Sequence, residues 1–202
     1  KERLQEMLGL RVDKRKYMIG LISRLTDQKG LDLINYCMDR LVDEFTQLVV
    51  IGTGEAQYEN MFRHYDWKYP DRVSANICYD ENRAHKRYAA ADACRMPSRF
   101  EPCGLTQLIA YRYGTVPIVR ETGGLKDTVQ PYNEFENTGD GFSFANYNGE
   151  ELLNIVNYSK NVFFEHKSNW NKMVDRGMRK DYSWNTSRSY YEGMYRYLLG
   201  EA

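Results

Sequence analysis

Short apolar runs alternate with longer segments of helical periodicity along most of this chain, and this alternation constrains the fold more than any other feature. The runs at 17–22 and 47–51 are almost continuously apolar, as strands covered on both faces are. Between them, residues 31–45 carry apolar side chains at the spacing of one helix face. Strands that alternate with helices in this way form a parallel sheet with helices on both faces. We therefore predict an α/β fold with a doubly wound parallel sheet.

The remaining elements continue the alternation and then give way to helices. We predict further strands at 73–77, 93–96, 116–119 and 142–144, and further helices at 1–10, 55–69, 81–91, 105–113, 149–160, 163–180 and 184–199. One strand is unusual, because Arg95 interrupts its apolar run and would carry a charge into a buried layer. A chain of 202 residues is long enough for one compact domain, and no repeat or linker divides it. We therefore expect residues 1–202 to form a single domain.

The charge composition weighs against two classes of partner, nucleic acids and anionic membranes. The chain has 28 Lys and Arg residues and 28 Asp and Glu residues, so its net charge is zero. Neither nucleic acid nor an anionic membrane is therefore expected as a partner, and no apolar run is long enough to span a bilayer. The four cysteines lack metal-like spacing, which fits reduced thiols in a cytosolic protein. No signal peptide is visible. Because the sequence begins at Lys1 without a Met and opens in mid-helix, we expect a piece of a longer protein.

The loop at 97–108 holds the most informative polar residues. Its two prolines stiffen the chain, and Gly104 permits a sharp turn and the close approach of another molecule. Glu101 lies between the prolines, and a helix is predicted to start just after it. The free N–H groups at such a start, here those of Gly104, Leu105 and Thr106, attract anions such as phosphate. The local pattern fits a buried turn with a capping glutamate equally well.

Several longer motifs carry a resemblance to one family. The segment 99–107, with the sequence RFEPCGLTQ, resembles a motif of bacterial glycogen synthases and plant starch synthases. Segments 113–120 and 122–129 continue the resemblance, and 23–32 matches a second motif in the expected order. Several long motifs in one order are much stronger evidence than one short motif. The resemblance implies a Rossmann-like fold, the C-terminal domain of a GT-B glycosyltransferase, with residues 182–199 as the helix that crosses to the absent N-terminal acceptor domain.

The resemblance also implies an activity. The parent enzyme would transfer glucose from ADP-glucose to the non-reducing end of an α-1,4-glucan, with retention of the anomeric configuration. This domain would bind the donor, and the absent domain would bind the glucan, so we expect the isolated chain to bind the donor weakly and to be inactive. No metal or cofactor is expected, and the chain contains no Asp-x-Asp pair to hold a metal. The expected location is the bacterial cytoplasm, or the plastid stroma for a starch synthase.

Three charged residues match catalytic positions of the family. Arg24 and Lys29 lie five residues apart after the first predicted strand, where the family's cations contact the diphosphate of the donor. By spacing alone, both residues would be interpreted as solvated loop charges. Glu101 matches the glutamate that binds the hydroxyl groups of the donor glucose, and we expect it to orient the sugar. The resemblance thus predicts Arg24, Lys29 and Glu101 as the catalytic residues.

Other positions match contacts of the family to the donor. Cys103, Gly104 and Leu105 match backbone N–H contacts to sugar and phosphate, and Thr106 lies beside them. Tyr79 matches an aromatic residue that stacks on adenine, although a tyrosine that only ends the third strand fits the pattern nearly as well. We therefore predict these five residues as substrate-binding.

Some features leave alternatives open. Ile109 stands where many related retaining transferases carry a second glutamate, a position that glycogen and starch synthases also lack. His85 and Arg87 lie on the same side of the predicted sheet, and we interpret them as structural.

The alternative functions are a non-catalytic module that binds a nucleotide or a glucan, and another retaining GT-B glycosyltransferase such as a sucrose synthase.

Overall fold

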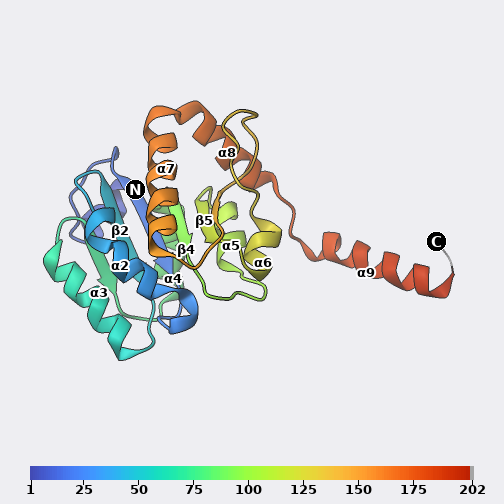
Figure 1. The fold of residues 1–202 in the computed structure, drawn as a ribbon, viewed down its shortest axis with the longest axis horizontal. Coiled ribbons are helices and arrows are strands. Elements are labelled where there is room, and N and C mark those ends of the chain that lie inside the picture. The colour runs from blue at the N-terminus through green and yellow to red at the C-terminus, as the bar shows by residue number, and fades with distance from the viewer. Residues whose placement is uncertain (201–202) are drawn as a thin grey trace.

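The computed structural model of this chain describes residues 1–200, and it describes the side chains of these residues except 81–83. Within the described residues, six parallel strands form one sheet in the order β3-β2-β1-β4-β5-β6 (Figure 1). The strands are β1 (Tyr17–Ile22), β2 (Thr46–Ile51), β3 (Val73–Asn76), β4 (Ala93–Met96), β5 (Val116–Arg120) and β6 (Phe142–Phe144). The helices are α1 (Glu2–Met7), the short 3-10 helix η1 (Asp27–Lys29), α2 (Leu31–Leu41), α3 (Ala56–Lys68), α4 (Glu81–Ala90), α5 (Thr106–Arg112), α6 (Gly123–Thr128), α7 (Gly149–Glu165), α8 (Lys167–Arg179) and α9 (Trp184–Leu199). The predicted doubly wound parallel sheet is confirmed.

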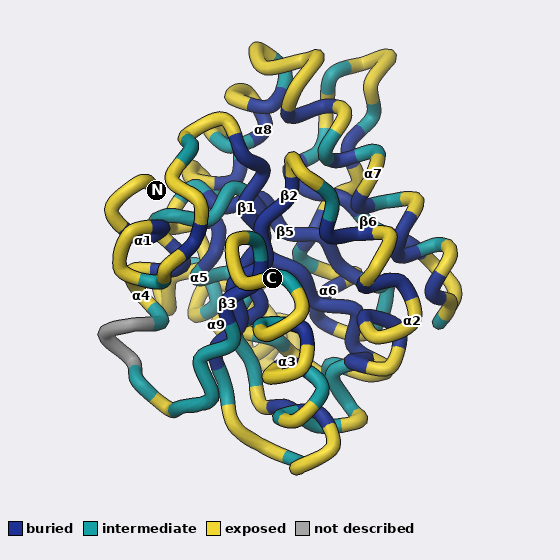
Figure 2. The backbone as a smooth tube through the Cα atoms, turned by 90° about the vertical axis from the view of Figure 1, so that its left-hand side faces the viewer, coloured by how far each residue is buried: buried dark blue, intermediate teal, exposed yellow. Residues whose placement is uncertain are grey.

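Helices cover both faces of the sheet, which is why most residues of its strands are buried. Side chains of α2, α3 and α7 form one core with the strands, and side chains of α4, α5 and α6 form a second core on the other face. Because side chains alternate along a strand, Ala93 of β4 packs in the first core and its neighbour Cys94 in the second. In Figure 2 the strands accordingly run as buried segments through the centre, and the exposed segments lie outside them.

The strand order places β1 beside β4, although two strands and the helices η1, α2, α3 and α4 separate them in the sequence. The chain moves outward from β1 through β2 to β3 and then returns to β4 on the other side of β1. Ligands of such sheets bind where the order reverses in this way, at the carboxyl ends of the two central strands. In this chain the loops that follow β1 and β4 meet at that point.

The last helix, α9, extends away from the rest of the molecule (Figure 1). None of its residues is buried, and Trp184, Tyr197 and Leu198 are 84%, 74% and 71% exposed. So many exposed large apolar side chains are typical of a surface that another structure covers. Its expected role as the helix that crosses to a second domain stays a prediction. No helix in the described part of the chain has the length and apolar composition that crossing a membrane requires.

The structure corrects the bounds of several predicted helices and adds one helix. The helix predicted at 31–45 ends at Leu41, because Asp43 accepts hydrogen bonds from the Phe45 N–H and the Thr46 hydroxyl in a turn that competes with the helix. Helix α7 continues to Glu165 without the predicted break at 161–162. Helix α6 was not predicted, since its two leading glycines have poor helix propensity.

Candidate functional site

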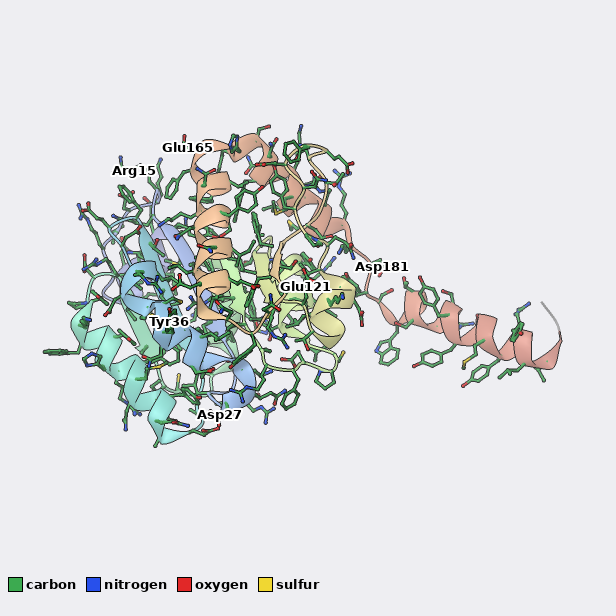
Figure 3. The ribbon with its side chains drawn as sticks, in the orientation of Figure 1. Arg15, Asp27, Tyr36, Glu121, Glu165 and Asp181 are labelled. Atoms are coloured by element: carbon green, nitrogen blue, oxygen red, sulfur yellow. The ribbon has the colours of Figure 1, made fainter. Side chains whose placement is uncertain are left out.

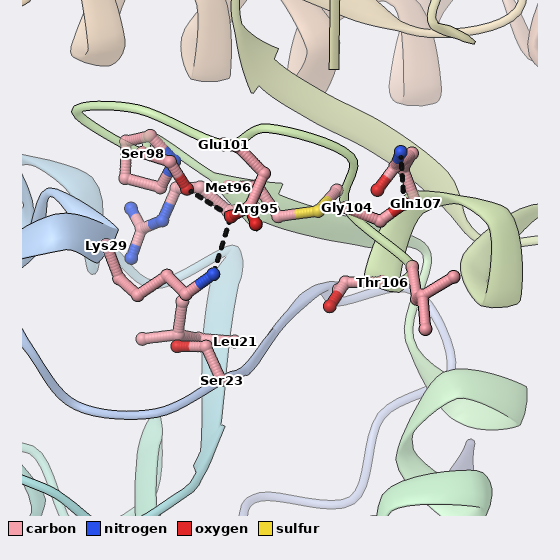
Figure 4. Close-up of a pocket in the computed structure, with 12 residues that line it drawn as sticks. Leu21, Ser23, Lys29, Arg95, Met96, Ser98, Glu101, Gly104, Thr106 and Gln107 are labelled. Atoms are coloured by element: carbon pink, nitrogen blue, oxygen red, sulfur yellow. Dashed lines mark hydrogen bonds and ion pairs between the residues drawn. The ribbon is translucent and has the colours of Figure 1, made fainter. Parts of the chain in front are cut away.

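The loop that follows β4 presents Glu101 at the carboxyl edge of the sheet. Lys29 Nζ lies 2.5 Å from Glu101 Oε2, and these side chains are only 17% and 14% exposed (Figure 4). The Ser98 hydroxyl donates a hydrogen bond of 3.2 Å to the same carboxylate oxygen. The ion pair joins residues 72 positions apart in the sequence. The structure therefore brings two of the predicted catalytic residues into direct contact.

Backbone contacts also fasten the loop after β4 to the loop after β1. The Arg99 N–H donates to the Gln28 carbonyl at 2.8 Å, and the Gln28 side-chain amide donates to the Phe100 carbonyl at 3.2 Å. Gly30 has φ 68°, and a Cβ atom at this position would lie 2.0 Å from the Pro97 carbonyl oxygen. A glycine is therefore required for the two loops to approach this closely.

The other side of the Glu101 loop rests on β5 and α6. Arg120 Nε donates to the Ser98 carbonyl at 2.8 Å, and its Nη2 donates to the Arg99 carbonyl. The Gly124 N–H donates to the Glu101 carbonyl at 3.0 Å. These bonds fix the backbone on both sides of the carboxylate, so the position of Glu101 is determined by three separate parts of the chain.

In the described part of the chain, the backbone at Gly104 and Leu105, which precedes α5, has free hydrogen-bond donors. Gly104 has φ 75°, and α5 begins at Thr106 rather than at the predicted Leu105. The N–H groups of Gly104 and Leu105 have no acceptor among the described residues. Free N–H groups that follow one another in a loop can bind an anion.

A first cavity of about 280 Å³ lies between these groups (Figure 4). Its walls include Lys29, Glu101, Gly104, Leu105 and Thr106, all of which were predicted as site residues. A hydrogen-bonding carboxylate, an ammonium group and free backbone donors together suit a polar, hydroxyl-bearing ligand with a negative charge.

A second cavity of about 290 Å³ adjoins the first, and Ser23 lines both. Arg24 lies on its wall, and Tyr79 is 90% exposed at the same cavity. Arg24 Nη2 lies 3.4 Å from Gln28 Oε1, so Gln28 connects the guanidinium to the loop that holds Glu101. Cys103 is exposed and lines neither of these two cavities.

Arg95 contributes to the wall of the first cavity and yet is 0% exposed. None of its three guanidinium nitrogens has a hydrogen-bond partner among the described residues. Burial lowers the pKa of Arg95, and the nearby groups that act on it are the Cys37 and Cys94 thiols and Tyr17. The prediction that Arg95 carries a charge into a buried layer is confirmed.

Sequence reasoning missed the residues that hold the site together. Ser98, Gln28 and Arg120 all position the Glu101 loop, although none was predicted as a site residue. The available signal was their location, since each lies at or just beyond the carboxyl end of a strand or within the motif around Arg24. His85, interpreted as structural, bonds to the Tyr113 hydroxyl at 2.9 Å and lines the second cavity.

In the part of the chain that the structure describes, no group of three or more His, Cys, Asp or Glu side chains could hold a metal ion.

Comparison with known proteins assigns the chain to a family. Residues 5–170 match the model of the family glycosyl transferases group 1. The glycogen synthases of Lachnospira eligens and Lachnoclostridium phytofermentans are 68% and 57% identical to the chain, over 96% and 98% of its length. The catalytic domain of starch synthase IV from Arabidopsis thaliana, bound to ADP and acarbose, matches 96% of the chain with a TM-score of 0.87 and 34% identity. The chain spans 41% of each of these three proteins. Because the family model covers most of its residues, the chain belongs to the glycosyl transferases group 1 family.

Proposed function

We propose that this chain is the donor-binding domain of a glycogen synthase. The parent enzyme would transfer glucose from ADP-glucose to the non-reducing end of an α-1,4-glucan, with retention of configuration. The observation that carries the proposal is the convergence of Arg24, Lys29 and Glu101 on two adjoining cavities at the switch point of the sheet. The 68% identity to a glycogen synthase and the likeness to a starch synthase bound to ADP support it.

The two cavities would divide the donor between them. The nucleoside would occupy the second cavity, where the exposed ring of Tyr79 is free to stack on adenine. The glucose would occupy the first cavity beside Glu101, and Ser23, which lines both cavities, would lie next to the diphosphate. Arg24 enters from the nucleoside side and Lys29 from the sugar side, so the diphosphate would be bound between two cations.

Catalysis in this proposal depends on charge and position. Negative charge grows on the departing diphosphate, and the Arg24 guanidinium, the Lys29 ammonium and the free N–H groups of Gly104 and Leu105 would stabilise it. An ammonium group has three donors, so Lys29 can retain Glu101 while it binds phosphate oxygen. Glu101, fixed by Lys29 and Ser98, would orient the sugar hydroxyls.

We place the acceptor site on a domain outside this chain. The exposed apolar face of α9 supports this placement, because such a face is typical of a surface that another structure covers. The isolated chain would then bind the donor weakly and elongate no glucan. The bacterial origin of its relatives supports a cytoplasmic enzyme.

Calorimetry with ADP-glucose tests the proposal. The Arg24→Ala variant should lose about 1.5–3 kcal/mol of binding free energy, the value of a charge-assisted hydrogen bond. Arg3→Ala, which removes an exposed arginine from α1, should leave affinity unchanged. Unchanged binding in the Arg24→Ala variant would remove this residue from the site. Tighter binding of maltoheptaose than of ADP-glucose would favour a glucan-binding module instead.

A further inference from the structure

A second polar concavity lies at the opposite edge of the sheet. This groove has a volume of about 910 Å³, more than three times that of either donor-site cavity. Its walls are segment 11–16 before β1, Phe45 before β2, and the junction of α7 with α8. In Figure 3, Arg15 and Glu165, which both line the groove, lie at the end of the molecule opposite Asp27 of the donor-site loop. The groove is therefore separate from the proposed donor site.

Positive charge is concentrated in this groove, although the whole chain is neutral. Six of the side chains that line it are Lys or Arg, and three are Asp or Glu. Two of the cations have carboxylate partners: Arg15 pairs with Asp13 at 3.1 Å, and Lys160 pairs with Asp43 at 2.5 Å. The remaining cations have no carboxylate partner among the described residues, so the groove has a local excess of positive charge.

One of these unpaired cations, Lys16, is buried, and a second, Lys167, is exposed but lies against an aromatic ring. Lys16 is only 8% exposed, and its ammonium contacts the Glu44 carbonyl and lies 5.7 Å from the centre of the Phe45 ring. Lys167 Nζ lies 3.7 Å from the centre of the Phe163 ring. Carbonyl dipoles and ring faces only partly replace a counter-ion.

The charges that face Lys167 do not neutralise it. Burial lowers the pKa of Lys167, while Asp92 opposes this effect and Lys1 adds to it. Asp92 and Lys1 already form a pair at 2.5 Å. A buried ammonium group without a counter-ion, such as that of Lys16, is costly, and an anion in the groove would offset that cost and would also meet the exposed charge of Lys167.

The groove also contains groups that suit a sugar ring. Phe45 and Phe164 are 57% and 38% exposed, with ring centroids 6.3 Å apart and planes at 74°. Asn157 and Asn161 are exposed one helical turn apart on α7 and line the same groove. Each amide offers both donors and an acceptor to hydroxyl groups, and the ring faces offer apolar surface to a pyranose.

We propose that this groove binds a phosphorylated hexose, with the phosphate against Lys14, Lys16 and Lys167 and the sugar ring between Phe164 and the amide groups. A neutral glucan would use the rings and amides but leave the ammonium groups uncompensated. Inorganic phosphate would use the ammonium groups alone. The inference concerns a separate surface and does not depend on the proposed donor function.

An NMR titration of the 202-residue chain with glucose 6-phosphate locates the site. We expect backbone amide shifts in segments 11–16 and 157–167, weakening as salt is raised because salt screens the charge. Shifts confined to 23–30 and 98–106 would place the sugar phosphate in the donor site and overturn the proposal. Absence of any shift would overturn it as well.

Variants test the lysines that would bind the phosphate and the aromatic ring that would contact the sugar. Lys14→Gln and Lys167→Gln should each weaken glucose 6-phosphate binding about tenfold through loss of a charge-assisted contact, whereas Lys172→Gln, at an exposed position of α8 outside the groove, should not. Phe164→Ala should weaken binding of glucose 6-phosphate but not of inorganic phosphate, and Phe135→Ala, at an exposed ring elsewhere, should change neither. Equal losses in the control variants, or maltoheptaose binding as tight as that of glucose 6-phosphate, would overturn the assignment.

One further variant separates this inference from the donor proposal. Arg24→Ala should weaken ADP-glucose binding and leave glucose 6-phosphate binding unchanged, because the two sites lie at opposite edges of the sheet. Loss of both affinities in this variant would place both ligands in one site and overturn the proposal. Loss of neither would contradict the donor assignment while leaving the groove assignment intact.

Discussion

Two cationic side chains that line the same cavity, Lys29 and Arg95, have opposite environments. Lys29, at the carboxyl edge of the sheet, is 17% exposed at its side chain and lies 2.5 Å from Glu101. Arg95, in the strand that leads into the Glu101 loop, is 0% exposed, and its guanidinium has no hydrogen-bond partner among the described residues. Both side chains line the same cavity, yet one charge is compensated and the other is not.

The difference follows from what each location can supply. At the edge, loops turn polar atoms inward, so Ser98 and Lys29 both bond to Glu101. In the buried layer, the neighbours that act on Arg95 include Tyr17 and Cys37, whose ordinary pKa values lie above neutral pH. Burial raises the pKa of each further, so neither carries a negative charge to compensate the guanidinium. A charge at the edge can therefore bind a ligand, whereas the charge in the layer reduces stability.

The largest effect on stability should come from disturbing the close contact between Gly30 and Pro97, where the loops after β1 and β4 meet. Gly30→Ala should reduce the free energy of unfolding by about 3 kcal/mol, because it adds left-handed backbone strain and a collision with Pro97. Gly9→Ala is the matched control, since Gly9 also has φ 68° but has nothing within 4 Å of its Cβ position, and should cost only about 1 kcal/mol. Urea unfolding of both variants measures the difference. Equal losses would show that the two loops are not in tight contact.

The next largest effect should be an increase in the free energy of unfolding, not a decrease. Arg95→Met should raise the free energy of unfolding by about 2 kcal/mol, because replacing an uncompensated buried charge with an apolar side chain removes its desolvation cost. Lys29→Met should instead lower it, since this change leaves the Glu101 carboxylate without its cation. The same urea experiment measures both variants. Destabilisation by Arg95→Met would mean that the guanidinium is compensated in solution.

The sequence was sufficient to predict those features that depend on local pattern. Apolar runs and helical periodicity predicted the parallel sheet and its carboxyl edge, because burial on both faces requires continuous apolar strands. Arg95 was recognisable as a charge within such a run. The end of α2 at Leu41 was not, because the Asp43 side chain decides it through a turn.

Contacts between distant segments could not be predicted in the same way. The bonds from Gln28 and Arg120 to the Glu101 loop join elements that are adjacent only in the folded chain. The groove at the opposite edge combines three separate segments, none of which forms a motif on its own. Periodicity locates elements, but it does not state which polar side chains will meet.

A smaller effect should separate binding of sugar from binding of nucleotide at the edge. Glu101→Gln keeps the shape of the side chain and removes its charge, so the preference for ADP-glucose over ADP should fall by about 1 kcal/mol, the value of one hydrogen bond. ADP should bind as tightly as before or more tightly, because Lys29 is released from its partner. Calorimetry with both ligands measures the change. Glu121→Gln, at a glutamate that bonds to Ser143 on the same edge, should leave the preference unchanged.

The smallest effect should come from a charge pair in open solvent. Arg40 and Glu150 join α2 to α7 through two hydrogen bonds of 2.8 and 3.1 Å, but each side chain is 48% exposed. The hydrogen bonds from Arg40, and then that from Tyr36, lower the pKa of Glu150. Because the folded-state pKa is lowered, the stabilisation is complete above the ordinary pKa of a glutamate and is lost as the pH falls through the lowered value.

The pH dependence of unfolding tests the value of this exposed pair. Arg40→Gln should lower the urea midpoint slightly at neutral pH and not at all once Glu150 is protonated, because water already solvates both charges. A loss as large as that of Lys29→Met would show that exposure does not decide what a charge pair contributes. In that case the contrast between the edge and the buried layer would need a cause other than exposure to solvent.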